Sequence, residues 1–135
     1  MGLRKKILVV EDDTDLRDML GEMIEDAGFS AIKVSGHKEA KRAMEDNIPD
    51  LVLLDLMLPD GDGLELCREA AGNDRPGCSP VIFILSGKNS IECKLKSFIC
   101  GAKRFFTKPF DTDELVDAIR ASLTTPNAPL PISGG

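Results

Sequence analysis

The sequence has no apolar run longer than five residues and no two cysteines at Cys-x-x-Cys spacing. A membrane-spanning helix needs about 20 apolar residues, so we expect none. The basic start at 1–6 leads into an apolar stretch too short for a secretory signal, and we therefore expect a cytoplasmic protein with reduced thiols. Neither the four cysteines nor His37, the single histidine, shows zinc-ligand spacing.

Positive charge is also in short supply, because 17 Lys and Arg face 23 Asp and Glu, a net charge of −6. A nucleic-acid surface needs clustered Lys and Arg, so we do not expect this domain to bind nucleic acid directly. At 135 residues the chain suits one domain that buries roughly two thirds of its unfolded surface. We expect that domain at 1–123, with 124–135, which holds three prolines, as a linker or tail.

What the sequence does contain is a regular alternation of five short apolar stretches with five stretches of helical periodicity. We expect strands at 7–10, 31–34, 51–54, 81–85 and 104–107, and helices at 14–27, 37–46, 63–71, 90–100 and 111–123. Asp13, Ser35 and Asp111 are the expected caps of the first, second and last helices. This alternation predicts an α/β fold, a doubly wound parallel sheet with helices on both faces.

Polar side chains stand at the carboxyl ends of four of these strands. Glu11 and Asp12 follow the first strand, Asp55 the third, Ser86 the fourth and Lys108 the fifth. Each has an ordinary alternative: the acids and the serine suit turns, and the lysine suits a solvated surface. Because ligands bind beyond the carboxyl ends of such strands, we expect these side chains to converge on one crevice.

Three carboxylates in one crevice repel one another unless a cation joins them. Oxygen ligands without Cys or His suit Mg²⁺, which shares its coordination shell with phosphate oxygens. Lys108 adds a second cation and Ser86 a hydroxyl donor, a combination typical of phosphoryl transfer. Asp55 lies between these groups and is the expected nucleophile, which would form an acyl phosphate.

These residues resemble a known family, the receiver domain of two-component response regulators. The resemblance covers about 5–123 and is carried by Glu11-Asp12, Asp55-x-x-x-Pro59-x-x-x-Gly63, Ser86-Gly87 and Lys108-Pro109. It implies a flavodoxin-like (βα)5 fold with a five-stranded sheet in the order 2-1-3-4-5. It also implies that Asp55 accepts a phosphoryl group from a phosphohistidine on a sensor histidine kinase or a phosphotransfer protein.

The resemblance further implies a magnesium site. Asp12 and Asp55 would bind Mg²⁺ directly, together with the backbone carbonyl of Met57, and Glu11 would act mainly through a bound water. Lys108 would contact the phosphoryl group.

A conformational switch is implied as well. The peptide bond from Lys108 to Pro109 would be cis, Ser86 would move toward the phosphoryl group, and Phe105 would turn inward behind it. The face made by 90–100, 104–107 and 111–123 would then change shape, and an effector or a second copy of the chain would bind there.

Three positions depart from what a sharp, short-lived switch needs. Phe105 has no hydroxyl, so packing alone would hold its inward rotamer. The apolar side chain of Met57 cannot position a hydrolytic water, and Lys88 occupies the other position at which family members vary. We therefore expect a longer-lived phosphoryl group than in a Met57→Asn variant.

Other functions stay open at this point: a phosphorelay shuttle, a receiver used only for docking, an aspartate-nucleophile phosphohydrolase and a nucleotide or flavin binder. Met57 stands where such a phosphohydrolase has a second aspartate, and a nucleotide binder would need a phosphate-cradling loop where this chain has three acids. Two apolar stripes are either core or docking surface: Leu16, Met19 and Leu20 on the first helix, and Ile91, Leu95 and Phe98 on the fourth. We expect the first helix and the loop after Lys108 to contact the kinase.

Overall fold

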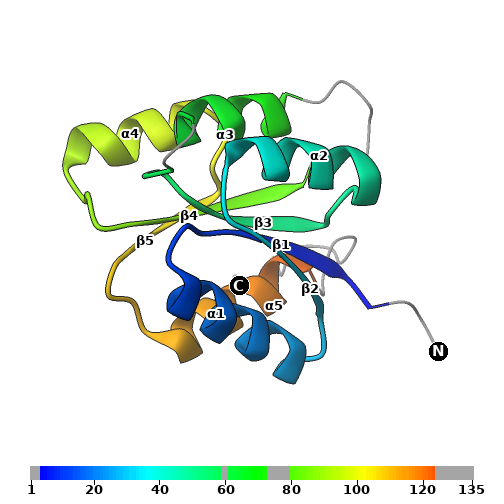
Figure 1. Cartoon of the computed structure of the whole chain (residues 1–135). Helices are drawn as coiled ribbons and strands as arrows, with labels where there is room; N and C mark the ends of the chain where they lie inside the picture. The colour runs from blue at the N-terminus through cyan, green and yellow to red at the C-terminus, as the bar shows by residue number, and fades with distance from the viewer. Residues whose placement is uncertain (1–3, 59–60, 73–79, 124–135) are drawn as a thin grey trace, which may run out of the picture.

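Five parallel strands form the middle layer of the molecule, and helices cover both of its faces (Figure 1). The computed structural model describes residues 4–58, 61–72 and 80–123. The strands are β1 (Lys6–Val10), β2 (Ser30–Val34), β3 (Leu51–Asp55), β4 (Val81–Ser86) and β5 (Arg104–Thr107). They pair in the order β2-β1-β3-β4-β5, and every neighbouring pair is parallel. The predicted flavodoxin-like sheet is confirmed.

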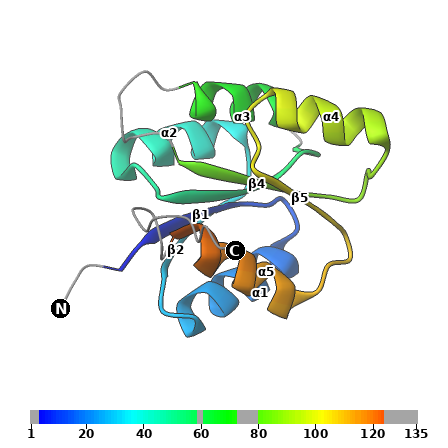
Figure 2. The same ribbon diagram turned by 180° about the vertical axis from the view of Figure 1, so that it is seen from behind.

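Two helices cover one face of the sheet and three cover the other. The helices are α1 (Thr14–Asp26), α2 (His37–Asn47), α3 (Gly63–Ala71), α4 (Ile91–Ile99) and α5 (Thr112–Leu123). Opposite views place α1 and α5 on one side and α2, α3 and α4 on the other (Figures 1 and 2). Every bound lies within a residue or two of its prediction. Within the described part of the chain, no helix combines the length and the apolar character that crossing a membrane requires.

Several expected features fall outside the described residues. They are Pro59 and Asp60 after β3, the loop at 73–79 with Cys78, and the tail at 124–135.

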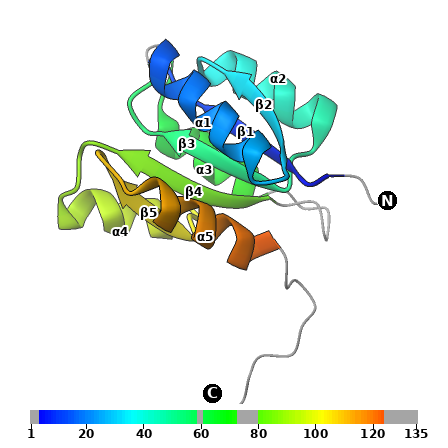
Figure 3. The same ribbon diagram turned by 90° about the horizontal axis from the view of Figure 1, so that it is seen from below.

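The alternation of side chains along each strand builds two separate cores. On β1, Ile7 and Val9 join the core beneath α1 and α5, whereas Leu8 and Val10 join the core beneath α2 and α3. The central strands β1 and β3 are therefore buried on both faces, which explains their unbroken apolar runs. Beneath the sheet α1 and α5 run side by side (Figure 3).

Two of the three predicted helix caps are confirmed. Asp13 Oδ1 accepts a hydrogen bond of 3.1 Å from the backbone N–H of Leu16. Asp111 Oδ1 accepts from the N–H groups of Asp113 and Glu114, at 2.9 and 3.1 Å. These side chains satisfy donors that the first turn of a helix leaves without an intrahelical partner.

The predicted cap of α2 is wrong. The N-cap is Gly36, which has no side chain to offer, and Ser35 stands one residue too early. The Ser35 hydroxyl donates instead to Glu39 Oε1 at 2.6 Å, and the same oxygen accepts the Ser35 N–H at 3.0 Å. Glu39, the third residue of α2, thus accepts hydrogen bonds from Ser35, the residue before the N-cap.

Gly63 has a packing role at the start of α3. A Cβ atom there would lie 2.6 Å from the Cα atom of Leu56, so only glycine fits without moving the backbone. Asp62 caps this helix, since its Oδ1 accepts from the N–H of Leu64 at 3.0 Å. The acid at 62 is therefore a structural cap.

Candidate functional site

The predicted site residues lie at the carboxyl edge of the sheet, where the strand order reverses between β1 and β3. Glu11 follows β1 directly, Asp55 ends β3, Ser86 ends β4 and Lys108 follows β5. Glu11, Asp55 and Ser86 are buried, and Lys108 is half-buried. Consecutive parallel strands therefore deliver these groups to one place, as the alternating pattern predicted.

Lys108 joins two buried carboxylates. Its Nζ atom lies 2.8 Å from Glu11 Oε1 and 3.1 Å from Asp55 Oδ2. The alternative of a solvated surface lysine is wrong. Buried carboxylates are costly unless a cation and hydrogen bonds compensate them, and here one ammonium compensates both.

Burial and charge act on these groups in different directions. Burial raises the pKa of Glu11, although hydrogen bonds from Lys108 and from the Asp13 N–H oppose the rise. Burial by itself lowers the pKa of Lys108, but its contacts with Glu11 and Asp55 raise that pKa above its usual value overall. The ammonium therefore stays protonated at neutral pH and holds both acids toward itself.

Backbone amides hold the second oxygen of each acid. Glu11 Oε2 accepts the N–H of Asp13 at 3.1 Å, and Asp55 Oδ1 accepts the N–H of Met57 at 3.0 Å. Both carboxylates are thus oriented through both of their oxygens. Asp55 presents Oδ2 to the ammonium and Oδ1 to the loop that follows β3.

Arg17 is a site residue that the sequence analysis did not single out. Its Nη1 donates to the backbone carbonyl of Glu11 at 3.0 Å and lies 3.5 Å from that of Asp12. The guanidinium therefore ties the acidic loop to the first full turn of α1. The available signal was an arginine one turn beyond the helix cap Asp13, on the helix that follows Glu11 and Asp12.

Ser86 and Lys108 are linked through their backbones. The Lys108 N–H donates to the Ser86 carbonyl at 2.9 Å. The Ser86 hydroxyl oxygen accepts the N–H of Lys88 at 3.0 Å and so closes the turn after β4. The peptide bond between Lys108 and Pro109 is cis.

Three other predicted site residues lie outside this cluster. The Asp12 side chain faces solvent, and Met57 is 57% exposed. Phe105 is half-buried on the α4 side of β5, with Lys94 Nζ 5.8 Å from the centre of its ring. The structure therefore brings together Glu11 and Asp55 with Lys108, and leaves these three residues outside the cluster.

The donor atoms fit magnesium by their chemistry. Glu11, Asp12 and Asp55 offer carboxylate oxygens only, the ligands that a hard divalent cation prefers. Their arrangement is incomplete, because within 4–58, 61–72 and 80–123 no three His, Cys, Asp or Glu side chains stand where they could hold a metal ion together. Lys108 compensates Glu11 and Asp55, and Asp12 is exposed.

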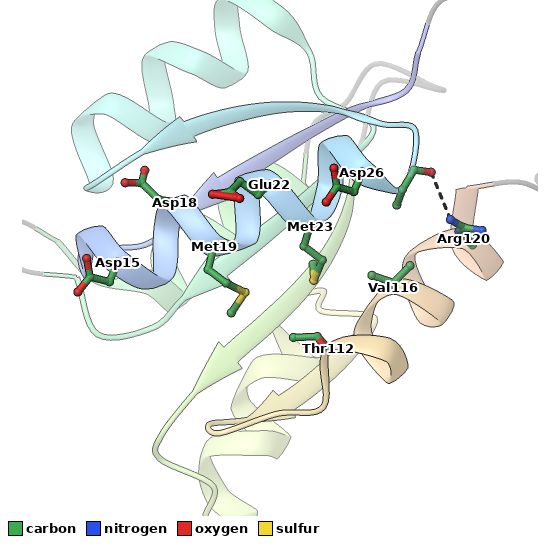
Figure 4. A pocket seen from close by; sticks show the side chains of 10 residues that line it. Asp15, Asp18, Met19, Glu22, Met23, Asp26, Thr112, Val116 and Arg120 are labelled. Carbon is green, nitrogen blue, oxygen red and sulfur yellow. Dashed lines mark hydrogen bonds between the residues drawn. The ribbon is translucent and has the colours of Figure 1, made fainter.

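A groove of about 620 Å³ runs between α1 and α5. Figure 4 shows Met19 and Met23 of α1 directed toward α5, where Val116 lies, with acids along the rest of the α1 surface. The acids that line the groove are Asp15, Asp18, Glu22 and Asp26. Of the stripe considered as a docking surface, Leu20 is fully buried core and Met19 is exposed.

The apolar stripe on α4 is surface. Ile91, Leu95 and Phe98 are all exposed, so the choice between core and surface left open by the sequence is decided for this helix.

Three cysteines in the described residues are free thiols. Cys67 and Cys100 are buried and Cys93 is half-buried. Burial, together with the neighbouring Cys100, raises the pKa of the Cys67 thiol to about 11. A buried, protonated thiol is a poor nucleophile.

Comparison with known proteins gives a consistent result. The family model described as the response regulator receiver domain matches residues 7–120. The phosphate regulon transcriptional regulatory protein PhoB of Pseudomonas aeruginosa is 34% identical over 135 residues, which cover 96% of this chain and 58% of that protein. The transcriptional regulatory protein PhoP of Escherichia coli is 37% identical over 116 residues, or 86% of this chain and 51% of that protein. The chain thus spans about half the length of these relatives.

Solved structures show the same likeness. A two-component response regulator from Clostridium difficile superposes with a TM-score of 0.85 at 26% identity, covering 93% of this chain and 100% of its own. A CheY-like receiver domain protein from Methanospirillum hungatei gives 0.83 at 30% identity, covering 90% and 95%. The BeF3-activated receiver domain of RstA from Klebsiella pneumoniae gives 0.79 at 27% identity, covering 87% and 97%.

Proposed function

This chain belongs to the family of response regulator receiver domains, and on that premise we propose that it signals by accepting a phosphoryl group on Asp55. The observation that carries the proposal is the contact of 3.1 Å between Asp55 Oδ2 and Lys108 Nζ. A carboxylate oxygen that can attack phosphorus is thereby placed beside a cation that can receive the oxygens of the transferred group.

The reaction follows from the positions of these groups. An oxygen of Asp55 forms a bond to phosphorus as the bond from phosphorus to a donor histidine nitrogen breaks. The imidazole keeps the electron pair of that bond and takes up a proton from solvent. Lys108 neutralises charge on the phosphoryl oxygens, and the Met57 N–H keeps the carboxylate oriented.

We assign the magnesium site to Asp12, Asp55 and the backbone carbonyl of Met57, with Glu11 acting through water. When bound, the ion supplies further neutralisation of the phosphoryl oxygens. The support is the oxygen-only donor set at the edge where Asp55 stands.

A histidine kinase or a phosphotransfer protein is the proposed donor. The groove between α1 and α5 is the proposed contact, because α1 begins two residues after Asp12 and α5 begins four residues after Lys108. A donor helix lying there would have the reactive edge within reach. We propose 1–123 as the receiver domain, which catalyses only its own phosphorylation and slow dephosphorylation.

The output follows from the same cluster. Ser86, whose hydroxyl lies at the end of β4, would turn toward the phosphoryl group, and Phe105 would fill the space behind it. Phe105 lies on β5 beside Lys94 of α4, so such a movement would reach the α4-β5-α5 face, where an effector or a second copy would bind.

The direct test is phosphorylation by acetyl phosphate with Mg²⁺, followed by intact-protein and peptide mass spectrometry. We expect an added mass of about 80 Da, that of HPO₃, on the peptide that holds Asp55. Asp55→Asn should not gain it, whereas Asp62→Asn, which removes a charge near the site and keeps an oxygen that can cap α3, should behave as the parent. An adduct that persists in Asp55→Asn would contradict the proposal.

A further inference from the structure

Two cysteines from different helices lie together where α3 passes the end of α4. These helices run side by side on one face of the sheet (Figures 1 and 2). Cys67 lies in the middle of α3, and Cys100 is the C-cap of α4. The Cys67 Sγ atom lies 3.5 Å from the backbone carbonyl oxygen of Cys100. Both side chains belong to the core beneath α2 and α3, so positions 33 residues apart bring two thiols to one place.

The backbones of the two helices approach closely at this point. Gly101, directly after Cys100, has a φ of +110°, and a Cβ atom there would overlap the Cβ atom of Ala71. Ala71 ends α3, one turn beyond Cys67. Glycine therefore allows the end of α4 to come this near to α3. A disulfide needs its two Cα atoms within about 7 Å of each other, and such a close approach of the two backbones favours that geometry.

The two sulfurs have different surroundings. Arg68 follows Cys67 on α3, and its Nη2 atom lies 3.8 Å from the Cys100 Sγ atom. A guanidinium in that place stabilises the negative charge that a sulfur develops as it attacks an oxidant. Burial and the neighbouring Cys100 raise the pKa of the Cys67 thiol to about 11, although Arg68 opposes the rise. Cys100 is 7% exposed and Cys67 is 0% exposed, so a small oxidant reaches Cys100 first.

We propose that Cys67 and Cys100 form a reversible disulfide when the protein encounters a peroxide. The Cys100 sulfur attacks one oxygen of hydrogen peroxide, the O–O bond breaks, and the departing hydroxide takes the thiol proton as water. The Cys67 sulfur then attacks the sulfur of the Cys100 sulfenic acid, and the S–O bond breaks. The second hydroxide takes the Cys67 proton. Two thiols thus lose two electrons and two protons in all, and one peroxide is reduced to two waters.

Proximity offsets the weak nucleophilicity of the protonated Cys67 thiol. A step between groups that the fold holds together is much faster than the same step between separate molecules. Cys93, the other described thiol, is a poor alternative partner for Cys100. It lies seven residues earlier on the same helix, a separation of about 10 Å along the axis.

The disulfide would change how α4 is held. This helix attaches to the core through small buried residues, Ser97 and Cys100, and a bond to Cys67 would add a covalent tether at its end. In a reducing compartment the bond would last only while the oxidant is present. The inference goes beyond phosphoryl transfer and uses no group of the Asp55 cluster, so it does not depend on the proposed function. If both hold, the tether would resist movement of α4 and couple its position to the redox state.

The test uses the full chain with Cys78→Ser and Cys93→Ser, which leaves Cys67 and Cys100 as its two thiols. The protein is treated with hydrogen peroxide, exposed thiols are alkylated after unfolding, and the mass is measured. We expect a loss of about 2 Da, the mass of two hydrogens, and no alkylation. Peptide mapping should find 67 linked to 100, and dithiothreitol should restore the parent mass.

Further variants assign the two steps. Cys67→Ala in the same background removes the second thiol, so dimedone, which labels sulfenic acids, should then modify Cys100. Far-UV circular dichroism checks that this variant folds, and the linked peptide in the parent background tests the proposal without it. Asp55→Asn should form the disulfide as readily as the parent, so failure of phosphorylation and failure of the disulfide are distinguishable.

Hydrogen exchange measures the tether. Oxidation should slow exchange of the α4 amides about threefold and leave those of α1 unchanged. Four outcomes would overturn the proposal: two free thiols after peroxide treatment, sulfinic acid on either cysteine without a linked peptide, disulfide-linked dimers in place of the internal bond, and equal exchange of α4 in the oxidised and reduced protein.

Discussion

Two lysine–aspartate contacts in this molecule have the same length but lie in opposite surroundings. Lys108 reaches Asp55 at 3.1 Å, with side chains 24% and 7% exposed. Lys33 of β2 reaches Asp18 of α1 at 3.1 Å, with side chains 43% and 55% exposed. Water screens the second pair, so its contribution to stability is small. The first pair exists because two strand ends force buried acids together, and one ammonium must serve both.

The largest expected effect is the removal of Lys108. Lys108→Met leaves Glu11 and Asp55 buried without their cation, and we expect the free energy of unfolding to fall by about 2 kcal/mol. Phosphorylation by acetyl phosphate should slow by about 100-fold. Urea unfolding in EDTA at pH 7 and the rate of adduct formation measure the two effects.

Lys33→Met is the matched control for that change. It keeps the aliphatic stem that crosses Gly21 and removes only the exposed charge, so a change within about 0.5 kcal/mol is expected. Equal losses in the two variants would show that burial does not distinguish the two contacts.

The second prediction concerns Met57, an exposed side chain beside a buried acid. Met57→Asn places an amide where a water could be oriented toward phosphorylated Asp55, and we expect dephosphorylation to quicken about tenfold. The backbone N–H that donates to Asp55 stays in place, so formation of the adduct should change little. Decay of the added mass after removal of acetyl phosphate measures the rate, and equal half-lives would contradict the prediction.

A third prediction concerns the effect of burial on the thiol of Cys67. Folding raises the pKa of Cys67 from 9.0 to about 11, so the folded state holds this proton more tightly than the unfolded chain does. The resulting stability is fully present below pH 9 and is lost as the pH rises through about 11. Between pH 8 and pH 11 the parent should therefore lose about 2 kcal/mol more than Cys67→Ala. Parallel pH profiles from urea unfolding would refute it.

The smallest expected effect belongs to Arg17, which is half-buried and so lies between the buried pair of Lys108 and Asp55 and the exposed pair of Lys33 and Asp18. Arg17→Gln removes the bond of 3.0 Å to the Glu11 carbonyl and loosens the acidic loop without exposing a buried charge. Phosphorylation should slow about threefold, and stability should change by less than about 1 kcal/mol. Arg17→Lys should restore part of the rate. A loss of stability with an unchanged rate would make Arg17 purely structural.

The sequence predicted the fold well because its local and global signals agree. The run from Leu51 to Leu54 is apolar at every position and is buried on both faces, and Gly63 starts a helix where the turn residues end, so neither boundary had a competitor. The predicted cap of α2 was wrong because either of two neighbouring residues, Ser35 and Gly36, could stand at the N-cap position. The hydrogen bond from the Ser35 hydroxyl to Glu39 leaves Gly36 as the N-cap.

The site was predictable as a place but not as a set of contacts. Strand ends bring Glu11, Asp55 and Lys108 to one edge, yet a linear pattern does not say which oxygen meets the ammonium. The contact of Arg17 depends on the path of the loop before α1. The exposure of α4 depends on small residues, Ser97 and Cys100, forming its attachment, which periodicity alone does not reveal.

The bond from the Lys108 amide to the Ser86 carbonyl has a consequence for how a signal leaves the site. This hydrogen bond holds the carboxyl ends of β4 and β5 at a fixed separation. The two strands therefore would not slide past each other if a group were added to Asp55. Under the proposed function, the change would then be carried by rotation of side chains while the strands stay in place, and its reach would be set by how far the Phe105 ring on β5 displaces α4.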